Sequence, residues 1–298
     1  MTSIAEPFRR RVGIDEAGYG PILGPLSIVL TLAEISDEAA FAHAVADYGV
    51  DDSKALHDPR DVSRLESVAL AAITWLTGST PNNAAALFAL FQEGDTQRGE
   101  LPWSIGAEDL RLPLAATTIP TWTIARAQPL GVYGALIHPS AMNHGAGQGR
   151  NRAHLEWDAI GAMLAQAAQG GPVTATCDRL GGRRYYQDPL AGVFPWCPIT
   201  VLEESRLFSR YTVEVPTGMV AITFAVGGER VDPLVAVASC IAKYAREVHM
   251  HLSNAWWGQR CAGLRPTAGY GSDAQRWLGE LPSTDRSTFS PILVRGNH

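Results

Sequence analysis

Short runs of apolar residues, bounded by glycine, proline or charged residues, are the first pattern along this chain. Their length predicts strands at residues 10–15, 27–32 and 172–178. Two more runs, at residues 211–215 and 219–226, flank the tripeptide Pro-Thr-Gly and predict a β-hairpin.

Longer stretches carry apolar residues at the three- and four-residue spacing of a helix that buries one face. This spacing predicts helices at residues 37–48, 59–75, 153–169 and 234–252. Asp232 stands directly before Pro233, and this pair is typical of an N-cap followed by proline at the first helical position. We therefore assign Asp232 a structural role.

Between residues 78 and 150 the pattern is looser. Strand-like pieces are interrupted by Pro129 and Gly131, and the polar, Gly-rich residues 143–150 are interpreted as a surface loop. We treat residues 78–150 as an insertion of unknown role.

Composition places the chain among packed globular proteins. It has 298 residues, of which 46% are hydrophobic and 18% charged, enough for one large domain with insertions or for two domains of ordinary size. No apolar run approaches the roughly 18 residues of a membrane span, and residues 1–11 lack an apolar signal core. The 4 cysteines show no C-x-x-C pairing. We expect reduced thiols, a cytoplasmic location and no membrane contact.

The formal net charge of −6 argues against a protein that coats nucleic acid electrostatically. It is compatible with an enzyme that contacts a few phosphates and brings a divalent metal to them. Lys54 and Lys243 are the lysines of the chain. Lys54 is either a solvated loop cation or a phosphate contact.

Two adjacent acids, Asp15 and Glu16, follow the first apolar run and precede a Gly/Pro-rich stretch, residues 18–25. Neighbouring carboxylates raise each other's cost of ionisation unless a cation lies between them. A metal-supported hydrolytic site is one interpretation. A charged strand end in a turn is the other, and for the pair alone it is the more usual.

Two further acids stand in comparable places. Asp178 ends the run at 172–178 and is followed closely by Gly181-Gly182. Glu229 lies just outside the helix that starts after Asp232, where the helix dipole favours a negative charge and the side chain is able to face a metal. The residues Arg183-Arg184-Tyr185-Tyr186 beyond Asp178 suit either a grip on a nucleic-acid backbone or a helix surface.

Taken together, these stretches resemble the type 2 ribonuclease H family, the bacterial ribonucleases HII and HIII. The matching elements are an opening motif, an Asp-Ser-Lys block, a central strand acid, a helix after the fourth acid, an element like the family's late Gly-Tyr-Gly-Thr and a stretch like its final His-Arg-x-Ser-Phe. In this chain they are residues 13–18, 52–56, Asp178, residues 236–247, 269–272 and 285–289.

The resemblance implies an α/β protein with a ribonuclease H-like fold, a mixed central sheet flanked by helices, here with an insertion and a C-terminal helical extension. It implies an endonuclease that cuts the RNA strand of RNA/DNA hybrids with two Mg²⁺ or Mn²⁺ ions. Asp15, Glu16, Asp178 and Glu229 would be both the metal ligands and the catalytic acids. One ion would activate water and the other would stabilise the leaving 3′ oxygen.

Two geometric expectations follow from these assignments. The four acids should converge on one pocket. Neighbours on a regular strand point to opposite faces, so Asp15 and Glu16 share a site only if the strand twists or bulges near Gly18, or if Glu16 uses its carbonyl.

The resemblance also implies substrate contacts with an RNA/DNA hybrid or with DNA containing ribonucleotides. By motif position, the contacting residues would be Gly18, Tyr19, Gly20, Ser53, Lys54, Lys243 and Tyr270. Tyr19 stands where the family usually has arginine, which puts recognition of single embedded ribonucleotides in question. Glu229 stands where Asp is commoner.

The expected organisation is a catalytic core of residues 1–77 and 151–252, the insertion at 78–150, and an extension at 253–298 with a substrate-contacting element. A monomer is favoured. Two alternatives stay open: a catalytically weak nucleic-acid-binding relative, and a nuclease of the same fold with another nucleic-acid substrate.

Overall fold

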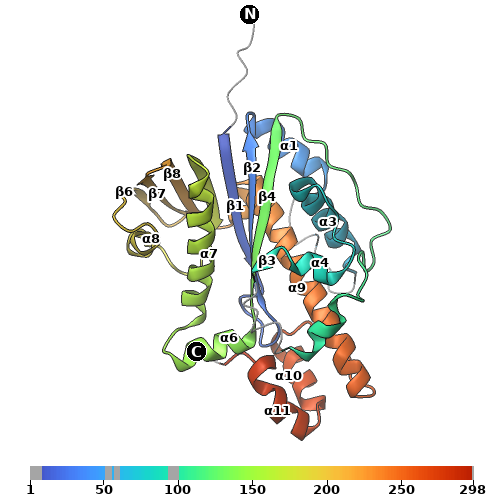
Figure 1. Ribbon diagram of the computed structural model, residues 1–298. Helices are drawn as coiled ribbons and strands as arrows, with labels where there is room; N and C mark the ends of the chain where they lie inside the picture. Colours follow the sequence, from blue (N-terminus) through green and yellow to red (C-terminus); the bar gives the residue numbers. More distant parts are fainter. Residues whose placement is uncertain (1–8, 51–55, 57–60, 93–100, 297–298) are drawn as a thin grey trace, which may run out of the picture.

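The computed structural model describes residues 9–50, 56, 61–92 and 101–296. Within these ranges the chain forms an eight-stranded mixed sheet with helices on both faces (Figure 1), as the α/β prediction required. The strands are β1 (Arg9–Ala17), β2 (Leu26–Ile35), β3 (Phe91–Gln92), β4 (Ala127–Ile137), β5 (Val173–Asp178), β6 (Ile199–Glu204), β7 (Phe208–Val215) and β8 (Gly218–Ala225).

Helices connect and cover these strands. They are α1 (Glu38–Asp47), α3 (Ser63–Thr77), α4 (Ala84–Phe88), α6 (Pro139–Gly147), α7 (Arg152–Gln169), α8 (Gln187–Val193), α9 (Pro233–Arg260), α10 (Gly271–Glu280) and α11 (Ser283–Leu293), with 3₁₀ turns η1 (Pro102–Ala107) and η2 (Gly228–Arg230). No helix within the described ranges combines the length and the apolar character needed to cross a lipid bilayer.

The sheet order β3-β4-β2-β1-β5-β8-β7-β6 brings three parallel strands together at its centre. β1 pairs in parallel with β5, and β5 pairs in parallel with β8. Their carboxyl ends therefore lie along one edge of the sheet, the usual place for ligands in open α/β sheets. The predicted hairpin is β7 and β8, which pair antiparallel.

Two apolar cores lie on the two faces of this sheet. Along β2, Ile28 and Leu30 pack into the core under α7 and α8, whereas Val29 packs into the core under α1, α3 and α9. Figure 1 shows α7 on one face of β1 and β2 and α9 on the other. A strand that is buried on both faces reads as a continuous apolar run, which is what residues 27–32 show.

The N-terminal end of α9 contacts β1 at backbone distance. A Cβ added to Gly13 would lie 2.2 Å from the carbonyl carbon of Leu234 and 2.3 Å from the amide nitrogen of Val235. Thr31 on β2 secures the same place, because its hydroxyl donates to the Leu234 carbonyl at 2.9 Å. Only a residue without a side chain allows this approach at position 13.

Asp232 is the N-cap of α9, as predicted. Its carboxylate accepts a hydrogen bond from the Leu234 amide at 3.0 Å, and Pro233 occupies the first helical turn. The same carboxylate accepts from the Thr176 hydroxyl at 2.8 Å and from Arg11 at 2.9 Å. It therefore ties the helix start to β5 and β1.

α9 is longer than its apolar pattern predicts, since it continues past residue 252 to Arg260. Polar Asn254 is accommodated because its side-chain amide donates to the Thr267 carbonyl at 2.9 Å and its oxygen accepts from the Thr267 amide at 3.0 Å. The helical extension at the C-terminal end of the chain consists of the end of α9 with α10 and α11.

The segment 78–150 contributes to the central sheet. β4 pairs with β2 along its whole length, from Leu26 opposite Ile137 to Ile35 opposite Ala127. The pairing shifts by one residue between Leu32 and Ala33, and this irregularity accommodates Pro129. The division of the chain into core, insertion and extension stays a prediction, but β4 is part of the same sheet as β1.

Residues 143–150 are not the surface loop that their glycines indicate, because α6 continues to Gly147. The helix is favoured by Pro139 at its first turn, and Asn143 donates to the carbonyls of Pro291 and Val294 at 2.9 and 2.8 Å. Contacts with the distant α11 segment thus outweigh the local preference of the glycines.

Candidate functional site

Asp15 and Asp178 lie at the carboxyl ends of β1 and β5. The register between β1 and β5 ends at Ile14 and Cys177, so Asp15 and Asp178 are the first residues beyond the part where these two strands pair with each other. Each is still paired on its other side, Asp15 with Val29 of β2 and Asp178 with Ala225 of β8. One carboxylate oxygen each of Asp15, Glu16 and Asp178 lies within 4.8 Å of the others. The gap between two parallel strands thus brings the three side chains together.

β1 continues to Ala17, past the predicted end at Asp15, so both Asp15 and Glu16 lie inside the strand. The pairing of β1 with β2 continues without a shift to Ala17 opposite Ser27, so no bulge occurs at this point. The two carboxylates nevertheless meet in one cluster. Gly18, with φ +86°, then turns the chain out of the strand.

Glu229 reaches the same place from the third parallel strand. β8 ends at Ala225, opposite Asp178, and Gly227 with φ +68° turns the chain into η2. The amide of Gly228 donates to Asp178 Oδ1 at 2.6 Å, which fixes the turn against β5. Glu229 Oε2 accepts from the Ser239 hydroxyl of α9 at 3.5 Å.

A single cavity of about 410 Å³ is lined by all four acids predicted from the sequence, Asp15, Glu16, Asp178 and Glu229. Glu229 is outside the group of three whose oxygens lie closest together. The structure thus brings the four side chains to one place from three different segments of the chain.

Burial makes ionisation of this cluster unfavourable. It raises the pKa of Asp15 to about 7, with a further contribution from the negative charge of Asp178. Burial also raises the pKa of Glu16 well above its usual value, and the charge of Asp15 adds to this shift. Lys243 acts in the opposite direction on Asp15, without cancelling the effect of burial.

The donor set fits a divalent cation. Its converging ligand atoms are all carboxylate oxygens, which Mg²⁺ and Mn²⁺ prefer, and the group contains no sulfur or imidazole ligand. A bound cation would also reverse the electrostatic penalty that raises the two pKa values. The residues of the cluster therefore suit the type of metal expected from the sequence.

The predicted substrate-contacting residues divide into three groups. Gly18, Lys243 and Tyr270 line the acidic cavity, and the Tyr270 side chain is 46% exposed. Tyr19 and Gly20 are in the loop that follows Gly18 and do not line the cavity. Ser53 and Lys54, like the predicted start of the helix at residue 59, lie outside the described residues.

Sequence reasoning missed the role of Arg246, whose side chain is only 2% exposed. Its guanidinium donates to the carbonyls of Leu23 at 3.3 Å and Ala268 at 2.9 Å, and it lies 4.7 Å from the centre of the Tyr270 ring. It thereby joins the Gly/Pro loop to the element that carries Tyr270. The spacing Ser239, Lys243, Arg246 on one helix face was the available signal.

Arg295 supports the same loop from the end of the chain. It donates to the carbonyls of Gly18 at 2.6 Å and Gly24 at 2.8 Å, and it is 3% exposed. Burial lowers its pKa to about 9, and the nearby charge of Arg246 contributes to the shift. No motif pointed to this residue.

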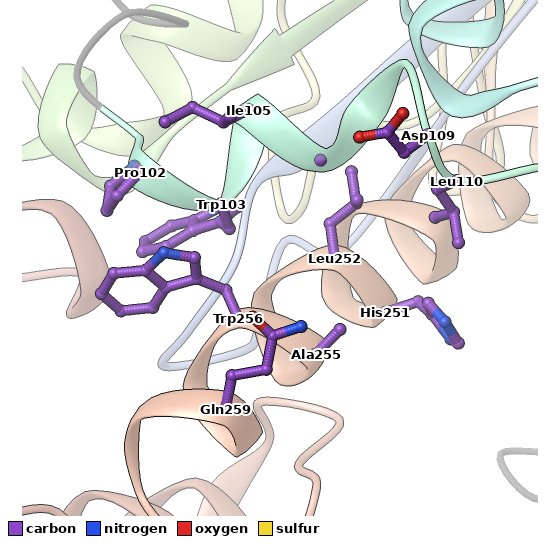
Figure 2. A pocket seen from close by; sticks show the side chains of 11 residues that line it. Pro102, Trp103, Ile105, Asp109, Leu110, His251, Leu252, Ala255, Trp256 and Gln259 are labelled. Carbon is purple, nitrogen blue, oxygen red and sulfur yellow. The ribbon is translucent and has the colours of Figure 1, made fainter.

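A second cavity, of about 460 Å³, lies between η1 and α9 (Figure 2). Trp103 and Trp256 lie together at one end of it, with ring centres 6.2 Å apart, and Asp109 is the carboxylate among its lining residues. It lacks a convergent set of charged groups. We therefore assign the candidate site to the acidic cavity.

Comparison with known proteins agrees with this assignment. Residues 12–73, which include most of β1 with Asp15 and Glu16, match the family model described as Ribonuclease HII. Among solved structures, the chain is similar to Bst-RNase HIII in complex with Mn²⁺, at 12% sequence identity and a TM-score of 0.51, over 96% of this chain and 66% of that chain. At this identity the likeness shows a shared fold.

Two further solved structures are similar at lower TM-scores. Ribonuclease H2 from Pyrococcus horikoshii OT3 has 18% identity and a TM-score of 0.45, over 95% of this chain and 92% of that chain. Aquifex aeolicus RNase H3 has 16% identity and a TM-score of 0.46, over 95% of this chain and 70% of that chain. No curated protein sequence matches the chain.

Proposed function

We propose, from the premise that the chain belongs to the type 2 ribonuclease H family, that it is a metal-dependent endonuclease that hydrolyses the RNA strand of RNA/DNA hybrids. The observation that carries this proposal is the acidic cavity. Asp15, Glu16, Asp178 and Glu229 line it together, although they come from β1, β5 and the turn after β8.

The metal would be held by these four carboxylates, as two ions of Mg²⁺ or Mn²⁺. When bound, the ions supply positive charge that favours the ionised form of an attacking water and stabilises the leaving 3′ oxygen. The cluster of Asp15, Glu16 and Asp178 supports this role, because its converging oxygens provide the ligand type that these ions prefer.

The surrounding residues hold the acids in place. The Gly228 amide donates to Oδ1 of Asp178 and so fixes the orientation of a carboxylate that lines the cavity. Lys243 donates to the Ser239 hydroxyl, and its charge favours the ionised form of Asp15. Lys243 thus offsets part of the effect of burial on Asp15, so the loss of the Asp15 proton that accompanies cation binding costs less free energy.

Tyr270 and the loop at residues 18–25 supply the substrate-facing rim. The exposed Tyr270 ring is held against Arg246 and is available to pack against a sugar or base. The loop offers backbone groups close to the cavity, and the amides of Ile22 and Leu23 bind the Gly269 carbonyl at 2.9 and 3.1 Å. Both rim elements are therefore positioned as one unit.

The test is cleavage of an end-labelled RNA/DNA hybrid by the full chain in Mn²⁺ and in Mg²⁺. We expect products with 5′-phosphate and 3′-hydroxyl ends. Asp15→Asn and Asp178→Asn should each reduce the rate at least about 100-fold, because each removes a charged ligand. Asp188→Asn is the matched control, since Asp188 is an exposed residue of α8 that does not line the cavity.

Other results would contradict the proposal in distinct ways. A wild-type chain that binds the hybrid but is as inert as both variants would support a catalytically weak binding protein. Cleavage of duplex DNA at a rate comparable to the hybrid would support a nuclease with another substrate. Hybrids with a single ribonucleotide, run in parallel, show whether Tyr19 permits recognition of embedded ribonucleotides.

A further inference from the structure

Arg152, the first residue of α7, lies on the loop that borders the acidic cavity. Its Nη1 donates to the carbonyl oxygen of Tyr19, and its guanidinium carbon lies 5.3 Å from the centre of the Tyr19 ring. The hydrogen bond and the cation–π contact together fix the guanidinium beside Gly18, which lines the cavity. Nothing in the sequence indicated this contact, because 133 positions separate the two residues.

The guanidinium has donors left for a ligand. Arginine carries five N–H donors, and among the described residues the Tyr19 carbonyl is the acceptor that Arg152 contacts. Glu156 lies one helical turn further on, where an ion pair with Arg152 would be expected. Both Glu156 oxygens are buried without a hydrogen-bond partner among the described residues. The charge of Arg152 therefore acts on this carboxylate without a hydrogen bond, and the carboxylate uses none of the N–H donors of Arg152.

The other arginines around the loop are not equally accessible. Arg246 and Arg295 are 2% and 3% exposed, and each binds backbone carbonyls. Arg152 is only partly buried. It is therefore the guanidinium on this loop that a large ligand is able to reach.

A polyanion that approaches four clustered carboxylates is repelled unless cations stand at the rim. Arginine suits this place because its planar fork binds a phosphate through two parallel N–H groups. Contact with the Tyr19 ring also reduces the rotamer freedom that a long side chain loses on binding.

We propose that Arg152 is a substrate-binding residue that contacts a phosphate of the nucleic-acid backbone next to the acidic cavity. This inference rests on the proposed function, because it requires a nucleic-acid substrate in that cavity. It assigns the contact to α7, outside every motif that carries the family resemblance.

The test compares Arg152→Ala with Arg150→Ala in the full chain. Both variants remove one positive charge from neighbouring positions, but Arg150 pairs with Asp158 and does not contact the loop. For each we would measure kcat and KM for hybrid cleavage, and the Kd for the hybrid by fluorescence anisotropy, between 50 and 300 mM KCl.

For Arg152→Ala we expect KM and Kd to rise roughly 5- to 20-fold at low salt, with kcat within about twofold of wild type. The slope of log Kd against log salt should fall by about one, the signature of one lost phosphate contact. Arg150→Ala should leave this slope unchanged. Arg152→Lys should restore most of the slope, because a lysine also neutralises one phosphate.

An unchanged slope in Arg152→Ala, or an equal fall in Arg150→Ala, would overturn the inference. If the contact of Arg152 with Tyr19 served only to hold the loop in place, both Arg152 variants would lose thermal stability. The slope of log Kd against log salt for the folded protein would then stay at the wild-type value. If the wild type binds hybrid without cutting it, the proposed activity is wrong while the binding slopes still decide the role of Arg152. If the wild type neither binds nor cuts hybrid, both proposals are wrong.

Discussion

Asp178 accepts a hydrogen bond from the backbone amide of Gly228 at 2.6 Å, and this contact joins the last residue of β5 to the turn that carries Glu229. The turn and the strand lie close together here. A Cβ added to Gly228 would be 3.1 Å from the Asp178 Cα and 3.2 Å from a methyl group of Val235. The position of Glu229 relative to Asp178 therefore depends on the absence of a side chain at position 228.

Gly228→Ala should separate the two acids with little loss of stability. The added methyl group forces the turn away from β5 by a few tenths of an ångström, which lengthens the bond to Asp178 and displaces Glu229. We expect hybrid cleavage to fall roughly 10- to 100-fold, because small displacements of reacting groups have large effects on rate. The free energy of unfolding should fall by only about 1 kcal/mol.

Gly192→Ala on α8 is the control for this substitution, since nothing lies within 4 Å of the added Cβ. Rates measured under single-turnover conditions, with urea unfolding of both variants, test the claim. Wild-type activity in Gly228→Ala would show that the site tolerates movement of Glu229.

The raised pKa of Asp15 predicts a pH-dependent loss of stability in the metal-free protein. Burial moves this pKa from 3.8 to about 7, so between these values the folded state holds a proton that the unfolded state has released. Stability then falls as pH rises through this window, and the penalty is complete above about pH 7. Asp15→Asn removes the penalty. We expect its Tm to exceed that of wild type by about 4 °C or more at pH 8, and by little at pH 4.

Metal should reverse this order at pH 8. Mn²⁺ binds the ionised cluster of the wild type and raises its Tm. Asp15→Asn has lost a ligand, so it should need at least about tenfold more Mn²⁺ for the same rise in Tm. Thermal unfolding in EDTA and at increasing Mn²⁺ concentrations measures the Tm of each protein without metal and its dependence on metal. A wild-type Tm that Mn²⁺ leaves unchanged would contradict the metal site, whatever the activity.

Much of this arrangement was predictable from local sequence. Strands, helices and the hairpin follow from apolar spacing, because burial against one or two layers sets that spacing. Asp232 was recognised as a cap because Pro233 fixes the local backbone. The convergence of Asp15 and Asp178 followed from their common place at strand ends and from the family motifs.

Contacts between distant segments were not predictable. Arg295 binds the Gly24 carbonyl across 271 positions, and no periodicity or spacing relates the two residues. β4 was assigned to an insertion because Pro129 and Gly131 interrupt its pattern, whereas pairing with β2 and a shift in register absorb both. The boundary of β1 was set too early because its charged residues are held in the strand by β2.

Gly13→Ala should be among the most damaging single methyl additions in the protein. The new Cβ would lie 2.2 Å from a backbone atom of Leu234, and neither β1 nor α9 is able to yield at that point without losing core contacts. We expect a loss of at least about 3 kcal/mol of unfolding free energy. Gly279→Ala on α10 meets nothing within 4 Å and should instead be neutral or stabilising by up to about 1 kcal/mol. Chemical denaturation of both variants tests this prediction. Equal changes in unfolding free energy in the two variants would contradict it.

The fully buried carboxylate of Glu66, on α3, holds the backbone of residues 114–116 in place. Its two oxygens accept hydrogen bonds from the amides of Leu114, Ala115 and Ala116 at 2.5 to 2.7 Å, and from the Tyr244 hydroxyl at 2.6 Å. All of these partners are donors, so the site requires an acceptor at both oxygens.

Glu66→Gln should therefore destabilise the protein although it preserves shape. Its amide group would direct N–H groups at donors, which leaves at least one of these donors without an acceptor beside a fully buried side chain, and we expect a loss of about 3 kcal/mol in urea unfolding. Tyr244→Phe removes one donor and no acceptor, so its loss should be smaller, about 1 kcal/mol. Glu108→Gln, on an exposed residue of the same segment, should change nothing measurable. If Glu66→Gln were no worse than Tyr244→Phe, the three backbone amides would not depend on this carboxylate, because a lost acceptor has to cost more than a lost donor here.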